Sequence, residues 1–215
     1  MLDINLFKVI MKYPLIFSIV FGIYAFLIIV GILFRKHFPK WLNSFISIAQ
    51  KQKIEQTENK FGKYREDVKN GNILTIIKCS LIVFSLNSLL VIQNIILSAL
   101  LLPLILQLGY VAIAQGKAFR ETKGSTFLSV FWFYVIGGLE WITYPLAISA
   151  GVFLTAGMVS TYILHKPLSV IGLLNDVMSI FIFCISILFV QSFLELIYIK
   201  KVLKHGGTGI PLKPY

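Results

Sequence analysis

Two long apolar stretches that almost lack charge constrain the fold of this chain more than any other feature. Residues 79–116 contain no formally charged side chain, and residues 124–165 contain only Glu140. As one helix, residues 79–116 would measure about 57 Å at roughly 1.5 Å per residue, nearly twice a bilayer core of about 30 Å. Each stretch therefore predicts two membrane-spanning helices joined by a tight turn.

The composition supports a membrane-embedded chain. Hydrophobic residues make up 57% of the sequence and charged residues 13%, with a mean hydropathy of +0.84. An ordinary globular domain has roughly 25% charged residues, so a soluble core is excluded as the main architecture. We expect an all-α, polytopic integral membrane helical bundle in which residues 1–215 form a single membrane domain. Because each pass takes about 20 residues, the chain has room for about six transmembrane helices plus one interfacial amphipathic helix.

The expected passes follow the apolar stretches. Pro14–Phe34 is longer than the apolar region of a signal peptide, which is about 7–15 residues, so it predicts a retained transmembrane helix. Turns are expected at Gln93-Asn94 and at Thr143-Tyr144. The other expected passes are Leu74–Ile92, Leu97–Gly116, Thr126–Ile142, Pro145–Leu164 and Val177–Leu194.

The one long polar stretch is residues 35–72, with nine Lys/Arg and four Asp/Glu. At about residues 38–52 its apolar side chains, including Trp41 and Phe45, fall largely on one helical face. This spacing predicts an amphipathic helix in the membrane interface, and the alternative is a helix packed on its own protein. Excess Lys/Arg marks cytoplasmic loops, so we expect loop 35–72 to be cytoplasmic in a multi-pass protein of the cell membrane. With six passes, both termini would then lie outside.

The net charge of +11 points to lipid rather than to nucleic acid. The basic residues gather in loops and tails beside apolar helices, which is typical of contact with anionic headgroups, and no nucleic-acid-binding motif accompanies them. We therefore expect membrane lipids and other membrane proteins, or a homo-oligomer, as partners. Cys79 and Cys184 lie far apart in apolar stretches, which predicts packing residues rather than a disulfide.

The common catalytic motifs are missing from the sequence. It has no Gly-x-Ser-x-Gly element, no His-Glu-x-x-His, no phosphate-binding Gly-rich loop and no Cys-x-x-Cys. His37, His165 and His205 fall at predicted helix ends or in the tail, where interfacial or solvated roles are expected. We therefore predict no enzyme activity, no catalytic residue, no metal site and no cofactor.

Glu140 is the sharpest candidate for a functional residue. A turn at Thr143-Tyr144 would put its carboxylate less than one helical turn from the membrane surface. It then either belongs to an intramembrane polar cluster or stabilises the hairpin as a helix-terminal charge. The expected cluster members are Glu140, Asn94, Lys78 and Tyr144.

Other polar and small residues have simpler expected roles. Amide side chains commonly hydrogen-bond between membrane helices, and we predict this for Asn87, Gln107 and Gln191. Glu195 is expected at the interface, one turn from basic residues. Small residues let helix backbones approach closely, and the predicted helix-packing positions are Gly137, Gly138 and Gly151.

The stretch from about Asn87 to Val159 resembles the stage II sporulation protein M family of multipass membrane proteins. The resemblance covers about a third of the chain. It departs from the family where Gln115 replaces an Asn and where Val135-Ile136 replaces Pro-His. The matching positions are Asn94, Gln115-Gly116, Gly137-Gly138-Leu139-Glu140, Pro145, Ala147, Ala150 and Gly151.

The resemblance implies a noncatalytic membrane component that assembles with partner membrane proteins. Founding members of the family act with cell-wall remodelling machinery during spore formation. We therefore expect a noncatalytic accessory or scaffold subunit. The alternative is a permease-type subunit of a membrane transporter, with Glu140 lining a pathway. A third possibility, an enzyme acting on lipid, lacks any paired acid–base or metal set.

Overall fold

The computed structural model describes residues 5–34, 62–100, 127–163 and 169–204, together with positions 37, 39–41, 44, 55 and 165. Every element formed by these residues is helical, so the predicted all-α class is confirmed for the described part of the chain. Most of the predicted amphipathic segment 38–52 lies outside the described residues, as does Phe45. Trp41 is helical and 70% exposed.

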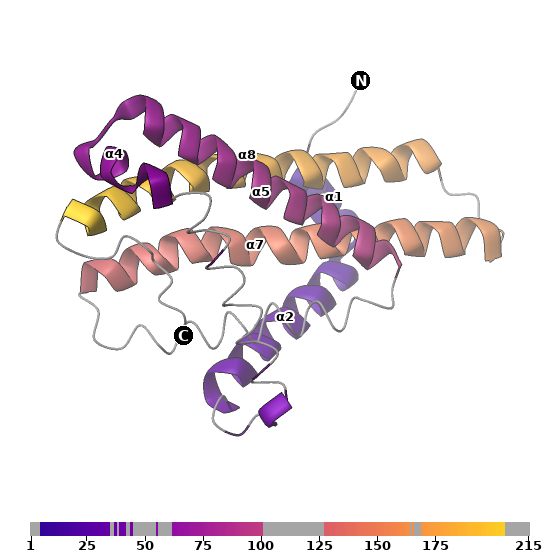
Figure 1. The fold of residues 1–215 in the computed structure, drawn as a ribbon. Helices are drawn as coiled ribbons and strands as arrows, with labels where there is room; N and C mark the ends of the chain where they lie inside the picture. The colour runs from indigo at the N-terminus through magenta and orange to yellow at the C-terminus, as the bar shows by residue number, and fades with distance from the viewer. Residues whose placement is uncertain are drawn as a thin grey trace.

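Three long helices form the body of the bundle (Figure 1). They are α5 (Ile73–Ala99), α7 (Phe127–Met158) and α8 (Val170–Lys204), and each packs against the other two. Their buried interface contains small and branched residues such as Val91, Ala147, Ile180 and Leu188. Cys79 and Cys184 are both buried and free, as expected for packing residues.

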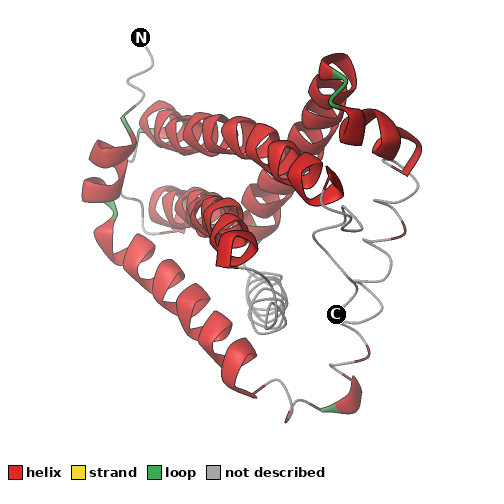
Figure 2. Ribbon diagram, turned by 90° about the vertical axis from the view of Figure 1, so that its left-hand side faces the viewer, coloured by secondary structure: helices red, strands yellow, loops and turns green. Residues whose placement is uncertain are grey.

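Shorter elements pack around this body. Helix α2 (Pro14–Phe34) crosses α7 at an angle, and α1 (Leu6–Lys12) packs on α8, as the two views show (Figures 1 and 2). Helix α4 (Arg65–Asn70), preceded by the 3-10 turn η2 (Gly62–Tyr64), packs on α5 and α8. Gly71 ends α4 with a left-handed φ of 78°. The side chain of Asn72 then accepts from the Thr75 N–H and starts α5.

Four helices of the described residues are long and apolar enough to cross a membrane. The candidate spans are Pro14–Phe34, Ile73–Ala99, Val135–Ile163 and Val170–Tyr198. The first of these has the predicted boundaries. The expected count of about six passes is not confirmed, and the pass expected at Leu97–Gly116 lies mostly outside the described residues.

The turn predicted at Thr143-Tyr144 is wrong. Helix α7 continues through it to Met158, and a π-helical segment, η3 (Val159–Ile163), extends it further. Pro145 has no backbone N–H to donate to the Trp141 carbonyl, yet α7 continues through it, and Ser149 Oγ donates to the Pro145 carbonyl at 2.8 Å. Broken helices expose backbone groups that lipid cannot satisfy. One helix of about 55 Å that projects beyond the bilayer core therefore replaces the predicted pair.

The turn predicted at Gln93-Asn94 is wrong for a related reason. Helix α5 runs through both residues to Ala99, and Asn94 is buried with 3% exposure instead of lying at a loop tip. Helix α7 crosses α5 just beyond this point. A Cβ on Gly151 would lie 2.5 Å from Ser98 Cβ and would also meet the Ile95 carbonyl. The close crossing holds this part of α5 inside the bundle.

Helices α5 and α7 run in the same direction. The end of α5 meets the second half of α7, where Thr155 Oγ1 donates to the Ala99 carbonyl at 2.5 Å. Helix α8 runs opposite to both, since Phe84 of α5 stacks edge-on with Phe189 of α8 at 5.4 Å. Helix α2 runs opposite to α7, because Phe17 contacts Phe153 and Tyr24 packs with Tyr144.

These directions define two ends of the molecule. The first, which we name the basic end, holds α4, the starts of α5 and α7 and the end of α8. The second, which we name the Asp176 end, holds α1, the end of α5 and the start of α8. Phe127 is about 42 Å from Thr155 along α7 at roughly 1.5 Å per residue. The end of α5 and the start of α7 therefore lie at opposite ends of the bundle.

Candidate functional site

Glu140 of α7 pairs with Gln191 of α8. The Gln191 side-chain amide, Nε2, donates to Glu140 Oε1 at 2.7 Å, across the interface between the two helices. Gln191 is fully buried, with 0% exposure, whereas Glu140 is half-buried. The partner of this carboxylate is therefore a neutral amide rather than a cation. The 2.7 Å distance between Nε2 and Oε1 is that of a strong, charge-assisted hydrogen bond.

The unbroken α7 places Glu140 inside a long helix rather than at a helix end. The residue lies about 20 Å from Phe127 and about 35 Å from Ile163 along the helix, at roughly 1.5 Å per residue. Tyr24, in the middle of α2, packs with Tyr144, which follows Glu140 by one turn. The expectation that Glu140 ends a helix at the interface is thus wrong, because the hairpin that placed it there does not form.

A carboxylate at this depth is costly when ionised. A charged side chain at the centre of a membrane helix costs about 2.5–3.5 kcal/mol on insertion scales. A hydrogen bond to a charged group contributes about 1.5–3 kcal/mol in return. The Gln191 amide therefore offsets a large part of the cost of the Glu140 charge, but it leaves little surplus.

Three further polar side chains lie in the same region of the bundle. The Tyr144 phenol interacts electrostatically with Glu140, with Tyr24 of α2 and with Glu195 of α8. Tyr24 and Tyr144 are buried, with 3% and 7% exposure. Glu195 follows Gln191 by four residues, so both face the same side of α8. We name these five residues, Glu140, Gln191, Glu195, Tyr24 and Tyr144, the carboxylate cluster.

Of the predicted cluster, the structure brings Tyr144 to Glu140 but not Lys78 or Asn94. Lys78 lies toward the basic end, where its Nζ is 5.2 Å from the centroid of the Tyr64 ring. This ammonium lowers the pKa of the Tyr64 phenol below its usual value. Asn94 is level with the crossing at Gly151, about 16 Å along α7 from Glu140 at roughly 1.5 Å per residue.

The predicted packing glycines fall into two groups. Gly151 lies where α7 crosses α5, and a side chain there would collide with the α5 backbone. Among the described residues, nothing lies within 4 Å of a Cβ added at Gly138. The nearest atom to a Cβ on Gly137 is the Trp141 ring nitrogen, at 4.0 Å. The described part of the chain therefore uses Gly151 internally and leaves the Gly137-Gly138 pair open.

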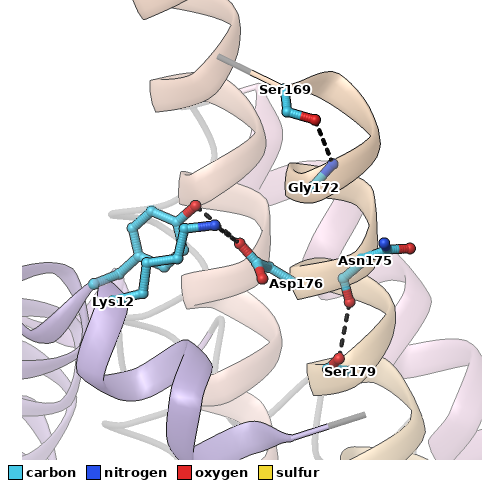
Figure 3. Close-up of polar contacts among 7 residues, drawn as sticks. Lys12, Ser169, Gly172, Asn175, Asp176 and Ser179 are labelled. Carbon is cyan, nitrogen blue, oxygen red and sulfur yellow. Dashed lines mark hydrogen bonds and ion pairs between the residues drawn. The ribbon is translucent and has the colours of Figure 1, made fainter. Parts of the chain in front are cut away.

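A second polar cluster joins α1 to α8 at the Asp176 end (Figure 3). Lys12 Nζ lies 2.6 Å from Asp176 Oδ2, and the Tyr13 hydroxyl donates to the same oxygen at 3.0 Å. The bond to Asp176 raises the pKa of Lys12, and burial raises the pKa of the Tyr13 phenol. Tyr13 also stacks on Phe153 of α7 at 4.3 Å. This cluster fixes the junction between α1 and α2 to the bundle.

Sequence reasoning missed two of these contacts: the one between Gln191 and Glu140, and the one that Asp176 makes with Lys12 and Tyr13. Gln191 was expected to bond between helices, but its pairing with Glu140 depends on the antiparallel register of α7 and α8. The four-residue spacing between Gln191 and Glu195 was the available signal, since it puts an amide and a carboxylate on one face. Asp176 had a signal too, because it is the one charged residue between Lys166 and Glu195.

The side chains of these clusters can form hydrogen bonds and can bind a proton or another cation. Among the described residues, no group of three or more His, Cys, Asp or Glu side chains is placed to hold a metal ion. No family model matches the chain, and no curated protein or solved structure matches it either.

Proposed function

We propose that this chain is a noncatalytic, multi-pass subunit of the cell membrane that assembles with partner membrane proteins. The observation that carries the proposal is the open Gly137-Gly138 pair on α7. Glycine in a helix interior costs about 0.8–1.0 kcal/mol relative to alanine. Gly151 repays that cost within the chain by letting α5 and α7 approach, whereas no atom of the described residues lies within 4 Å of a Cβ added at Gly138.

A second membrane helix would use this open pair well. Small residues allow two backbones to approach closely in lipid, where packing and not the hydrophobic effect drives association. The two glycines also belong to the Gly-x-x-Glu element that resembles the stage II sporulation protein M family. We include membership of that family, and assembly with membrane-bound cell-envelope proteins or a second copy, in the proposal.

The direction of the helices supports a specific orientation. Helices α5 and α7 run in the same direction and α8 runs opposite to both, so the start of α5 and the end of α8 lie on one side of the membrane. Loop 35–72 leads into α5 and lies on that same side. One side of the membrane then has the nine Lys/Arg of that loop together with Lys200, Lys201 and Lys204. The other side has Lys8, Lys12 and Lys166. By the positive-inside rule, the basic end is cytoplasmic.

The test of assembly is a glycine substitution that spares the fold. Gly138→Val fills the open surface of the Gly137-Gly138 pair, and Gly22→Val is the control for the substitution itself. A Cβ on Gly22 also meets none of the described residues within 4 Å, but Gly22 has no second glycine beside it. After chemical crosslinking in native membranes and mild-detergent purification, we expect Gly138→Val to lose its partner or second copy. Gly22→Val should keep it. Retention of the same assembly by both variants would contradict the proposal.

The carboxylate cluster favours a second candidate, a permease-type subunit of a transporter. Ionisable residues inside a membrane bundle commonly mark a substrate or ion pathway. In liposomes containing the purified assembly, this function predicts an ion or solute flux that Glu140→Gln abolishes. A flux unchanged by that substitution would remove the cluster from any pathway.

A further inference from the structure

The buried amide of Gln191 lacks a partner at one of its two polar atoms. Nε2 donates to Glu140, but Oε1 is buried and accepts no hydrogen bond from the part of the chain that the structure describes. Because both atoms belong to one planar amide group, Oε1 is buried close to the contact that Nε2 makes with Glu140. A buried acceptor without a donor is rare in proteins, so this oxygen needs a donor or a cation.

Rotating the amide does not remove the problem. If the Gln191 side chain were turned over, its oxygen would face Glu140 Oε1, and two acceptors would meet. That arrangement becomes favourable only when Glu140 carries a proton, which the carboxyl group can then donate to the amide oxygen. Both orientations therefore leave an oxygen atom of the cluster that a proton or a small cation would satisfy.

The charges around the Glu140–Gln191 pair also favour a bound proton or cation. Glu140 and Glu195 are each near enough to the Tyr144 phenol to act on it electrostatically. Negative charge in a medium of low dielectric constant favours binding of a proton or another cation. The other titratable group that faces them from α2 is Tyr24. The one charged residue of α5 is Lys78, which lies over the Tyr64 ring.

We propose that the carboxylate cluster is a binding site for one monovalent cation, held by oxygen atoms of Glu140 and Gln191 with Glu195 beside them. The ligand is either a proton on Glu140 or a Na⁺ ion. Carboxylate and amide oxygens suit both, because they accept a proton and are the ligands that hard cations prefer. The site does not depend on partner assembly, and it holds for a subunit that is not a transporter.

Thermal unfolding of the full chain in lipid nanodiscs tests the proposal. A ligand that binds the folded state raises its unfolding temperature in proportion to the logarithm of its concentration, at saturating levels. Sodium chloride is therefore raised from roughly 1 to 300 mM against choline chloride at fixed ionic strength, and the pH is lowered separately without Na⁺. A Na⁺ site predicts a rise with Na⁺ alone, and a proton site predicts a rise with falling pH alone.

Two variants assign the response to the cluster. Glu140→Gln removes the charge, and Gln191→Met removes the amide oxygen while keeping the length of the side chain. Either response should disappear in Glu140→Gln and shrink in Gln191→Met. The same shifts in wild type and both variants would overturn the proposal, as would the absence of both shifts in wild type. If a variant does not fold, binding of sodium-22 and uptake of protons are measured on the wild-type chain instead. The proposal is overturned if the wild-type chain shows neither.

Discussion

Filling the α5–α7 crossing at Gly151 should destabilise the bundle more than any other glycine substitution on α7. In Gly151→Val, the new Cβ would lie 2.5 Å from Ser98 Cβ and 2.9 Å from the Ala99 nitrogen. Ordinary contacts between such atoms are about 3.5–4.0 Å, so the two helices must separate by about 1 Å. The colliding atoms include backbone, which cannot rotate away as a flexible side chain can.

The magnitude follows from the cost of overpacking. Extra atoms in a well-packed core cost typically about 1–3 kcal/mol, and a backbone collision belongs at the upper end of that range. For a chain of this size, each 1 kcal/mol lowers the unfolding temperature by about 2–4 °C, so a fall of roughly 6–12 °C is expected. Gly138→Val is the matched control on the same helix, because it makes the same change in helix propensity without a collision.

The assay is thermal unfolding of the purified chain in detergent, followed by circular dichroism or intrinsic fluorescence. The account predicts a large fall for Gly151→Val and little change for Gly138→Val. Equal unfolding temperatures for the two variants would refute the close α5–α7 crossing. They would also remove the contrast between used and open glycines on which the assembly proposal depends.

Two further predictions concern polar contacts between helices. Asp176→Asn removes the ion pair with Lys12, which is half-exposed and therefore worth less than about 1 kcal/mol. The pKa values of Lys12 and Tyr13 are raised in the folded state, so the free energy of unfolding of the wild type should be constant below their ordinary pKa values and should fall as the pH rises above them. In chemical unfolding at alkaline pH, Asp176→Asn should show a shallower fall than the wild type. Thr155→Val keeps the side-chain shape but removes the donor to the Ala99 carbonyl, and a loss of about 0.6–1.7 kcal/mol in unfolding free energy is expected. A Thr155→Val chain as stable as Thr155→Ser would contradict that hydrogen bond.

Helix identity could be predicted from the sequence where the apolar length matches one bilayer crossing. Pro14–Phe34 has such a length and basic residues on both sides, and its boundaries are correct. The same length rule failed in α7, because it assumes that a helix stops at the membrane surface. A helix that continues beyond lipid satisfies its own backbone, and Pro145 with the Ser149 hydroxyl beside it does not break it.

The candidate site could be predicted only in part. The rarity of charge around Glu140 singled it out, and Tyr144, four residues later, had to share its helical face once α7 was unbroken. The partners Gln191, Glu195 and Tyr24 come from other helices. Their approach depends on the register of α8 and α2 against α7, which apolar patterning does not encode, because both helices are apolar almost all round.

Labelling of single cysteines from outside intact cells tests most directly whether α5 and α7 cross the membrane in the same direction. In a background with Cys79 and Cys184 changed to alanine, cysteines replace the exposed Lys8 and Lys69 and the partly exposed Lys200, and they report three regions of the chain. The account predicts that an impermeant maleimide labels position 8 directly and labels positions 69 and 200 only after permeabilisation. Labelling of position 200 from outside, with position 69 protected, would mean that α5 and α7 cross the membrane in opposite directions and would contradict the parallel arrangement.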